Sequence, residues 1–183
     1  MTITSTAEKV WWKEPLERTE LVWIVIALVW CLIMFFMMPY WHLYGQQNLA
    51  NEAYRAKPED FAAKTEDMIA KYKVREEGGD LKVPVVRPPA GADVYMIARL
   101  WSWYPQLELE AGKSYRIHLM SMDWLHGFSL QPENINIQVH PGYEHILTVT
   151  PTNPGTYAII CNEYCGINHH TMASRLYVVK GGQ

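Results

Sequence analysis

The chain has 183 residues, enough for one domain of ordinary size with short extensions. Its 16 Lys and Arg residues are outnumbered by 19 Asp and Glu residues, which gives a formal charge of −3. This balance lacks the basic excess that neutralising phosphates requires, so nucleic acid is not an expected partner. The 8 Trp and 11 Tyr residues suit a membrane interface, a docking surface or a packed β core.

An unbroken apolar run covers residues 21–38 and is long enough to cross a bilayer as a helix. A cleaved secretory signal would instead have a shorter apolar core followed by small residues at a cleavage site. Here Pro39, Tyr40 and Trp41 come next, and such aromatic side chains are typical of a membrane interface. We therefore expect one retained transmembrane helix with its interfacial belt over residues 21–44.

The charges on either side of this run predict its orientation. Lys9, Lys13 and Arg18 precede it, whereas the first cation after it is Arg55. Because positively charged flanks stay in the cytoplasm, residues 1–20 should form a cytoplasmic N-terminal segment. The rest of the chain should then lie on the periplasmic or extracellular side of the cell membrane.

The two regions that follow differ in composition. Residues 45–92 are polar, and Pro58 begins a helical pattern that runs to about Tyr72, so we expect a helical spacer and linker there. Residues 93–183 hold short runs rich in Val, Ile, Tyr and Leu between turn signals, which predicts a mainly β domain, either a sandwich or a small barrel. The expected strands cover residues 94–101, 114–120, 135–139, 145–150, 155–160 and 175–179.

The segment CNEYCGINHHTM gathers soft metal ligands in a short stretch of sequence. Cys161, Cys165, His169 and Met172 offer two thiolates, an imidazole and a thioether. A thioether points toward copper. A Cys161–Cys165 disulfide outside the membrane and a zinc site with two Cys and two His are alternatives, but neither explains Met172. Copper is therefore the expected metal.

A further nitrogen ligand is expected from His126 in the segment DWLHGF, which we interpret as a loop between two strands. Single-copper electron carriers built on a β-sandwich use one Cys, two His and a weak axial Met. This chain offers two Cys residues where such a site has one. Because two thiolates can bridge a pair of coppers with one His on each metal, the residues favour a two-copper electron-transfer site.

Together, CNEYCGINHHTM and DWLHGF resemble subunit II of cytochrome c oxidases. The resemblance implies a cupredoxin-like Greek-key β-sandwich or barrel that holds a binuclear copper centre, CuA. Cys161 and Cys165 would be its bridging thiolates, and His126 and His169 its terminal imidazoles. Met172 would be a weak ligand on one copper.

The resemblance also assigns two roles to Glu163. Its backbone carbonyl would bind the second copper, and its carboxylate is a candidate ligand for magnesium at the boundary with a catalytic subunit. A single membrane span, where many family members have two, is most similar to the ba-type branch of heme-copper oxidases.

The implied function is electron transfer within a membrane complex. Cytochrome c or a similar donor would reduce the copper, and the electron would pass to a heme in catalytic subunit I, where oxygen is reduced. Trp101 and Trp103, in the aromatic segment RLWSWY, are candidates for receiving the electron. The alternatives are the equivalent subunit of a nitric oxide reductase and a membrane-tethered copper-delivery protein. The chain would thus belong to an oxidoreductase complex without carrying catalytic residues of its own.

Overall fold

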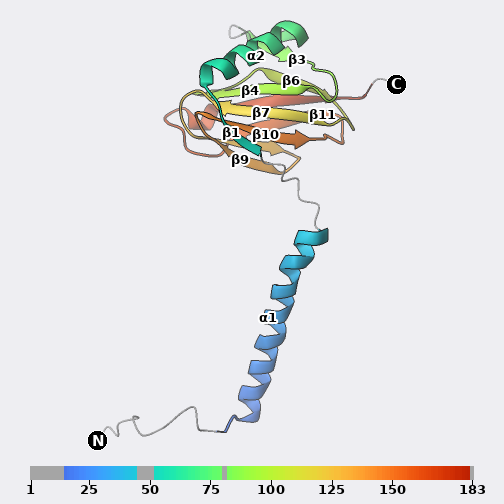
Figure 1. Ribbon diagram of the computed structural model, residues 1–183, viewed down its shortest axis with the longest axis vertical. Helices are drawn as coiled ribbons and strands as arrows, with labels where there is room; N and C mark the ends of the chain where they lie inside the picture. Colours follow the sequence, from blue (N-terminus) through green and yellow to red (C-terminus); the bar gives the residue numbers. More distant parts are fainter. Residues whose placement is uncertain (1–14, 45–51, 80–81, 182–183) are drawn as a thin grey trace, which may run out of the picture. The chain divides into compact units, whose positions relative to one another are not determined.

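The structure is a computed structural model that describes residues 15–44, 52–79 and 82–181. The chain forms two compact units, residues 1–47 and 48–183. The first unit contains helix α1, and the second contains the β domain with helix α2 (Figure 1).

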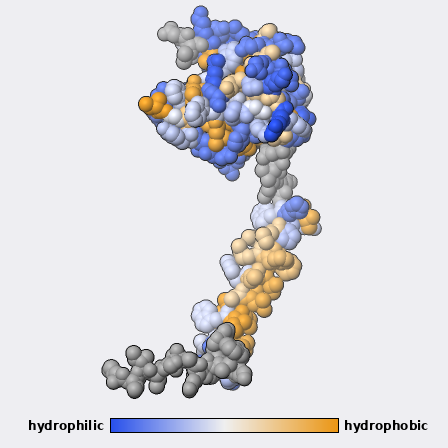
Figure 2. All heavy atoms as spheres, turned by 60° about the vertical axis from the view of Figure 1, so that its left-hand side comes forward, coloured by the Kyte–Doolittle hydropathy of each residue, from blue (hydrophilic) through white to orange (hydrophobic). Residues whose placement is uncertain are grey.

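Helix α1 runs from Arg18 to Tyr44. Its apolar side chains are exposed and distributed around the helix, so it has no single apolar stripe that would pack on a protein core. Figure 2 shows the hydrophobic surface along the face of the helix in view. Within the described ranges it is the one helix long and apolar enough to cross a membrane. This agrees with the single span expected over residues 21–44.

The second unit contains two β-sheets, which we call the first and the second sheet. The strands of the first sheet lie in the order β1-β10-β7-β4-β5, with bounds Glu52–Arg55, Tyr143–Val149, Tyr115–Ser121, Asp93–Arg99 and Ser102–Tyr104. The second sheet has the order β2-β3-β6-β12-β11-β8-β9, with bounds Lys73–Glu77, Val83–Val86, Gln106–Glu110, Ala173–Val179, Gly155–Cys161, His126–Gln131 and Ile135–Val139. Most neighbours are antiparallel, but β4 pairs with β7, and β6 with β3 and β12, in parallel.

The hydrophobic core fills the space between the two sheets. Side chains alternate along a strand, so Leu107 and Leu109 of β6 point inward, where Ile117 and Leu119 of β7 meet them from the other sheet. Burying each such side chain stabilises the fold by roughly 1.5–3 kcal/mol. The expected mainly β, cupredoxin-like fold is confirmed as a sandwich of two open sheets.

Residues 52–92 contribute strands to both sheets in addition to the expected helix. β1 extends the first sheet by pairing with β10, and β2 and β3 extend the second sheet beside β6. The sequence predicts strands only from residue 93 onward, because β1 and β2 are rich in charged, exposed residues at sheet edges and β3 is a four-residue run that contains Pro84. Such strands show no clear alternation of apolar and polar residues.

Helix α2, Pro58–Tyr72, lies against β4 of the first sheet (Figure 1). Pro58 occupies its first turn, where the missing N–H would have no partner within the helix. The expected helix is present, and its apolar side chains Phe61, Met68 and Ile69 are buried. The helix therefore covers part of the sandwich instead of standing apart from it.

A buried carboxylate joins the added strands to the second sheet. Glu108 of β6 accepts charge-assisted hydrogen bonds from Arg75 of β2 and from Arg87, which follows β3. Burial alone would raise the pKa of Glu108, but the hydrogen bonds from the two guanidinium groups outweigh it and hold the pKa below its ordinary value. Glu108 is therefore ionised at neutral pH and anchors β2 and β3.

Candidate metal centre

The predicted ligands meet at one edge of the second sheet. His126 is the first residue of β8, Cys161 is the last residue of β11, and Met172 directly precedes β12. Because β11 is antiparallel to both neighbours, its end lies beside the starts of β8 and β12. The Cys161 N–H donates to the Met172 carbonyl at 3.0 Å, which ties the two ends together. His126 thus begins a strand, where the sequence analysis expected a loop.

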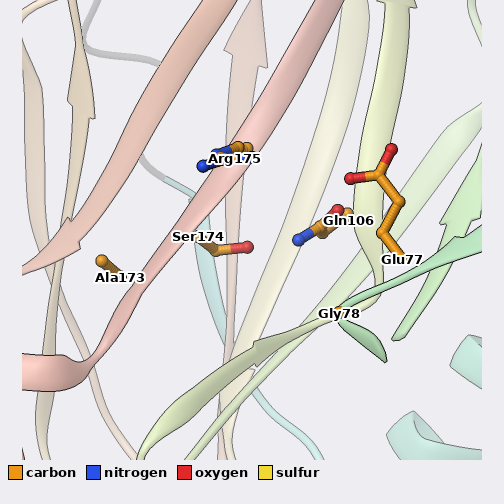
Figure 3. A pocket seen from close by; sticks show the side chains of 6 residues that line it. All are labelled: Glu77, Gly78, Gln106, Ala173, Ser174 and Arg175. Atoms are coloured by element: carbon orange, nitrogen blue, oxygen red, sulfur yellow. The ribbon is translucent and has the colours of Figure 1, made fainter. Parts of the chain in front are cut away.

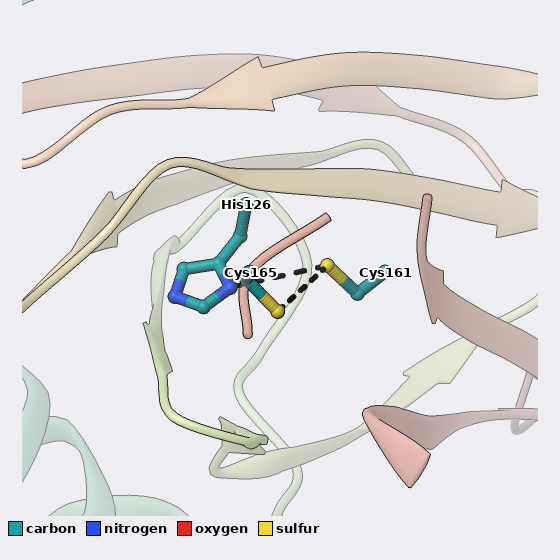
Figure 4. A group of neighbouring side chains, drawn as sticks. All are labelled: His126, Cys161 and Cys165. Carbon is teal, nitrogen blue, oxygen red and sulfur yellow. Dashed lines mark hydrogen bonds between the residues drawn. The ribbon is translucent and has the colours of Figure 1, made fainter. Parts of the chain in front are cut away.

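The ligand atoms form a chain of short contacts. Cys161 Sγ lies 3.9 Å from His126 Nδ1 and 3.7 Å from Cys165 Sγ, and Figure 4 shows the three side chains converging. Cys165 Sγ lies in turn 3.6 Å from His169 Nδ1 and 3.8 Å from Met172 Sδ. Sulfur atoms that share a metal at about 2.3 Å and a tetrahedral angle lie roughly 3.8 Å apart, so the spacing fits ligands of a common metal site.

The geometry can be compared with the two alternatives to copper, a disulfide and a single zinc site. A disulfide requires an S–S distance of about 2.05 Å, whereas the two thiols are unbonded and 3.7 Å apart. His126, Cys161 and Cys165 have ligand atoms within 4.8 Å of one another, and within the described part of the chain His169 does not join this compact group. A single tetrahedral zinc would need all four ligands in one group. Within the described residues, the two Cys and two His side chains are therefore not gathered as one tetrahedral zinc would need.

Burial shapes the chemistry of the sulfur ligands. Cys161, Cys165 and Met172 are all buried within the core cluster. Burial, together with the hydrogen bond and charge of Cys161, raises the pKa of the Cys165 thiol to about 11. A bound metal cation offsets the free-energy cost of ionising the buried thiol, because metals bind the thiolate and release its proton. Without a metal, the raised pKa keeps the Cys165 thiol protonated at neutral pH.

Asp123 orients the buried histidine, a role that was not predicted from the sequence. Its Oδ1 lies 2.7 Å from His126 Nε2. Burial alone would raise the pKa of Asp123, but hydrogen bonds from His126 and from the backbone N–H groups of Leu100 and Trp124 lower it overall. Because a carboxylate only accepts, His126 Nε2 carries the proton and Nδ1 presents its lone pair toward Cys161. A carboxylate three residues before a predicted His ligand was the available signal.

The remaining predicted ligands lie on the loop after β11. His169 begins the short 3-10 helix His169–Thr171, is partly exposed, and has its ring centroid 5.8 Å from that of Tyr164. The Glu163 backbone carbonyl lies 3.3 Å from Cys161 Sγ, and its binding of a copper stays a prediction. Magnesium binding by the Glu163 carboxylate stays a prediction; its Oε1 accepts a hydrogen bond from Gln138 at 2.9 Å.

The two tryptophans of the aromatic segment have different surroundings. Trp101 Nε1 donates to the Cys165 carbonyl at 3.2 Å, and the indole lies against Gly166. Trp103 is buried and packs edge-on against His126 at a centroid distance of 6.3 Å. An apolar hollow of about 390 Å³ includes the predicted ligand Cys165 in its lining, together with Leu100, Trp101, Trp124, Tyr164 and Gly166. Trp101 thus lines this hollow and also contacts the backbone of Cys165.

A second hollow, of about 370 Å³, lies on the second sheet beside the start of β12 (Figure 3). Glu77, Gln106 and Arg175 are among the side chains that line it. The Glu77 carboxylate and the Arg175 guanidinium carry opposite charges, so the hollow has no clear preference for an anion or a cation. The ligand cluster is therefore the stronger functional candidate.

Comparison with known proteins connects this cluster to a family. The family model described as cytochrome c oxidase subunit II, periplasmic domain, matches residues 98–179. A cytochrome c oxidase subunit 2 of Thermus thermophilus is 36% identical over 109 residues, which cover 57% of this chain and 81% of the relative. A probable cytochrome c oxidase subunit 2 of Streptomyces coelicolor is 37% identical over 75 residues, which cover 41% of this chain and 24% of that protein.

A solved structure shares the fold. The cryo-EM structure of a heme-copper terminal oxidase dimer contains a chain that matches 88% of this chain and 100% of its own length, with a TM-score of 0.58 and 21% identity. At this identity the match supports the architecture alone.

Proposed function

Because this chain belongs to the cytochrome c oxidase subunit II family, we propose that it is the electron-accepting subunit of a heme-copper terminal oxidase. The observation that supports the proposal best is the chain of ligand atoms from His126 through Cys161 and Cys165 to His169. Two thiolates between two imidazoles suit a pair of coppers. Bound there, the copper pair supplies a one-electron redox couple.

The protein residues keep the ligands fixed during electron transfer. Three sulfur ligands and His126 are buried in a packed core, so little can move when the charge of the centre changes. Asp123 holds the ring of His126 through Nε2. Burial also excludes water and slows metal exchange, which argues against the copper-delivery alternative.

The apolar hollow is the proposed docking place for the electron donor. Trp124 and Tyr164 are 65% and 81% exposed beside it, so a donor with an apolar contact surface would bury them on docking. We propose Trp101, and not the buried Trp103, as the residue that receives the electron, since its indole N–H bonds the backbone of ligand Cys165. The proposed donor is cytochrome c or a similar small carrier.

The proposed topology follows from α1 and the cations beside it. One apolar helix fits a single-pass membrane protein. Lys9, Lys13 and Arg18 precede the apolar run, so the N-terminus would be cytoplasmic and the metal domain would lie outside, facing the donor. The electron would pass from the metal centre to a heme of catalytic subunit I, where oxygen is reduced.

The test uses the full chain in detergent, loaded with copper. We expect two coppers per chain and an electron paramagnetic resonance spectrum in which one unpaired electron is shared by two copper nuclei. Cys165→Ser should abolish this spectrum, because Cys165 contacts both halves of the site. Cys31→Ser, in helix α1, is the matched control and should leave it unchanged. A Cys165→Ser chain with the wild-type spectrum would refute the proposal.

A further inference from the structure

The edge strand β9 reaches the metal-binding loop with two side-chain amides. Asn136 and Gln138 are two residues apart and therefore share a face of the strand. The Gln138 Nε2 donates to Glu163 Oε1 at 2.9 Å, and the Asn162 Nδ2 donates to Asn136 Oδ1 at 2.9 Å. Two consecutive loop residues, Asn162 and Glu163, are thus held by β9 residues that are not themselves predicted metal ligands.

The neighbouring strand β8 also contacts Asn162 and Glu163, through Gly127. The Asn162 N–H donates to the Gly127 carbonyl at 3.3 Å. A Cβ atom at Gly127 would lie 2.0 Å from Asn162 Oδ1 and 2.8 Å from the Glu163 nitrogen. Only glycine allows this approach, so the loop backbone lies directly on the strand that begins with His126.

These contacts converge on one backbone group of the site. The Glu163 carbonyl points to Cys161 Sγ at 3.3 Å. The side chain of the same residue is fixed by Gln138, and its N–H side is confined by Gly127. With the residue held on both sides, the direction of its carbonyl is fixed relative to the sulfur.

We propose that Gln138 is a positioning residue for the metal centre: by holding the Glu163 side chain, it sets the position of the Glu163 carbonyl beside Cys161. This inference rests on the proposed function, since a carbonyl at this position matters when copper is bound. Partners in the outer shell of a metal site commonly change metal affinity by roughly 10- to 100-fold and tune its redox potential. Gln138 acts in this way through Glu163 and does not touch the metal.

The experiment compares Gln138→Met with a matched control. Methionine has a similar length but no amide, so the hydrogen bond to Glu163 is lost. Gln131→Met is the control, because Gln131 also lies in the second sheet, and its amide donates to the Ser129 hydroxyl at 3.3 Å. In the copper-loaded full chain, we expect Gln138→Met to keep two coppers, to shift the midpoint potential beyond the control, and to lose copper to a chelator roughly tenfold faster.

A merely structural hydrogen bond would lower the melting temperature of the metal-free chain and leave the potential of the bound copper unchanged. A Gln138→Met potential and copper-loss rate equal to those of Gln131→Met would therefore overturn the inference. Glu163→Met removes the same hydrogen bond from the other side, so it tests the inference should Gln138→Met fail to fold. The double variant should shift the potential by no more than the larger single shift, since both break one contact.

The outcomes separate this inference from the proposed function. A wild-type chain that binds no copper, or binds it without a shared-electron spectrum, contradicts the proposed function itself. A wild-type spectrum with an unshifted Gln138→Met contradicts the positioning role alone.

Discussion

The two histidines of the candidate copper centre are held in opposite ways. His126 lies on a strand, is fully buried, and has its second ring nitrogen bound by Asp123. His169 lies on a short 3-10 helix, is partly exposed, and has the exposed ring of Tyr164 beside it. The site therefore combines a rigid interior half with an accessible outer half. Rigidity favours a fixed metal geometry, while accessibility brings the centre close to a docked donor.

The largest expected effect comes from removing each imidazole in turn. His126→Ala should lose the shared-electron spectrum and lower the free energy of unfolding by about 3 kcal/mol, because it opens a buried cavity and leaves Asp123 without its partner. His169→Ala should also lose the spectrum but stay close to wild type in stability, since its ring is partly exposed. Chemical denaturation of the metal-free chains measures the difference.

Added imidazole sharpens this contrast. It can enter the space vacated in His169→Ala from solvent and should restore the spectrum there, whereas the buried space in His126→Ala should exclude it. Equal rescue of both variants would show that the two halves do not differ in accessibility.

A smaller effect is expected for Asp123→Asn, which keeps the shape of the side chain but removes the charge. The amide no longer requires His126 to carry its proton on Nε2, so the ring loses its preference for presenting Nδ1 to the metal. We expect copper affinity to fall by roughly 10- to 100-fold. Competition with a chelator of known affinity measures it, and an unchanged affinity would mean that core packing alone orients the ring.

The smallest effect on occupancy is expected for Met172→Leu. Leucine is similar in volume to the buried methionine, so the core should remain packed. Two coppers should stay bound, because both thiolates and both imidazoles remain, but the midpoint potential should change with loss of the thioether. Complete loss of copper would contradict a weak-ligand role for Met172.

The fold class and a set of candidate ligands could both be predicted from the sequence. The types of the predicted ligands indicate copper, and all of these ligands except His126 lie in one segment of the sequence. The strands with alternating apolar residues were also predictable, whereas β8 was not, because it begins with His126 and Gly127, which are typical of a turn. β6 alternates Leu and Glu and could have been found by that pattern.

Contacts across the sheet were harder to predict. Gln138 and Glu163 are 25 residues apart, and a lone amide in a strand has no signature that names its partner. The role of Gln138 depends on the register that pairs it with Gly127, which only the folded sheet defines. The residues that form hydrogen bonds with a metal-binding loop therefore cannot be predicted before the strand order is known.

The strands that follow α1 in the chain have a consequence for synthesis. β1 must wait for β10 before it can pair, and the β2–β3 pair must wait for β6 before it can join the second sheet, so the first strand made by the ribosome is among the last to find a partner. A recombinant fragment that starts at residue 93 would leave the edges of β10 and β6 bare and prone to aggregation. A fragment that starts at Asn48 keeps the whole compact unit.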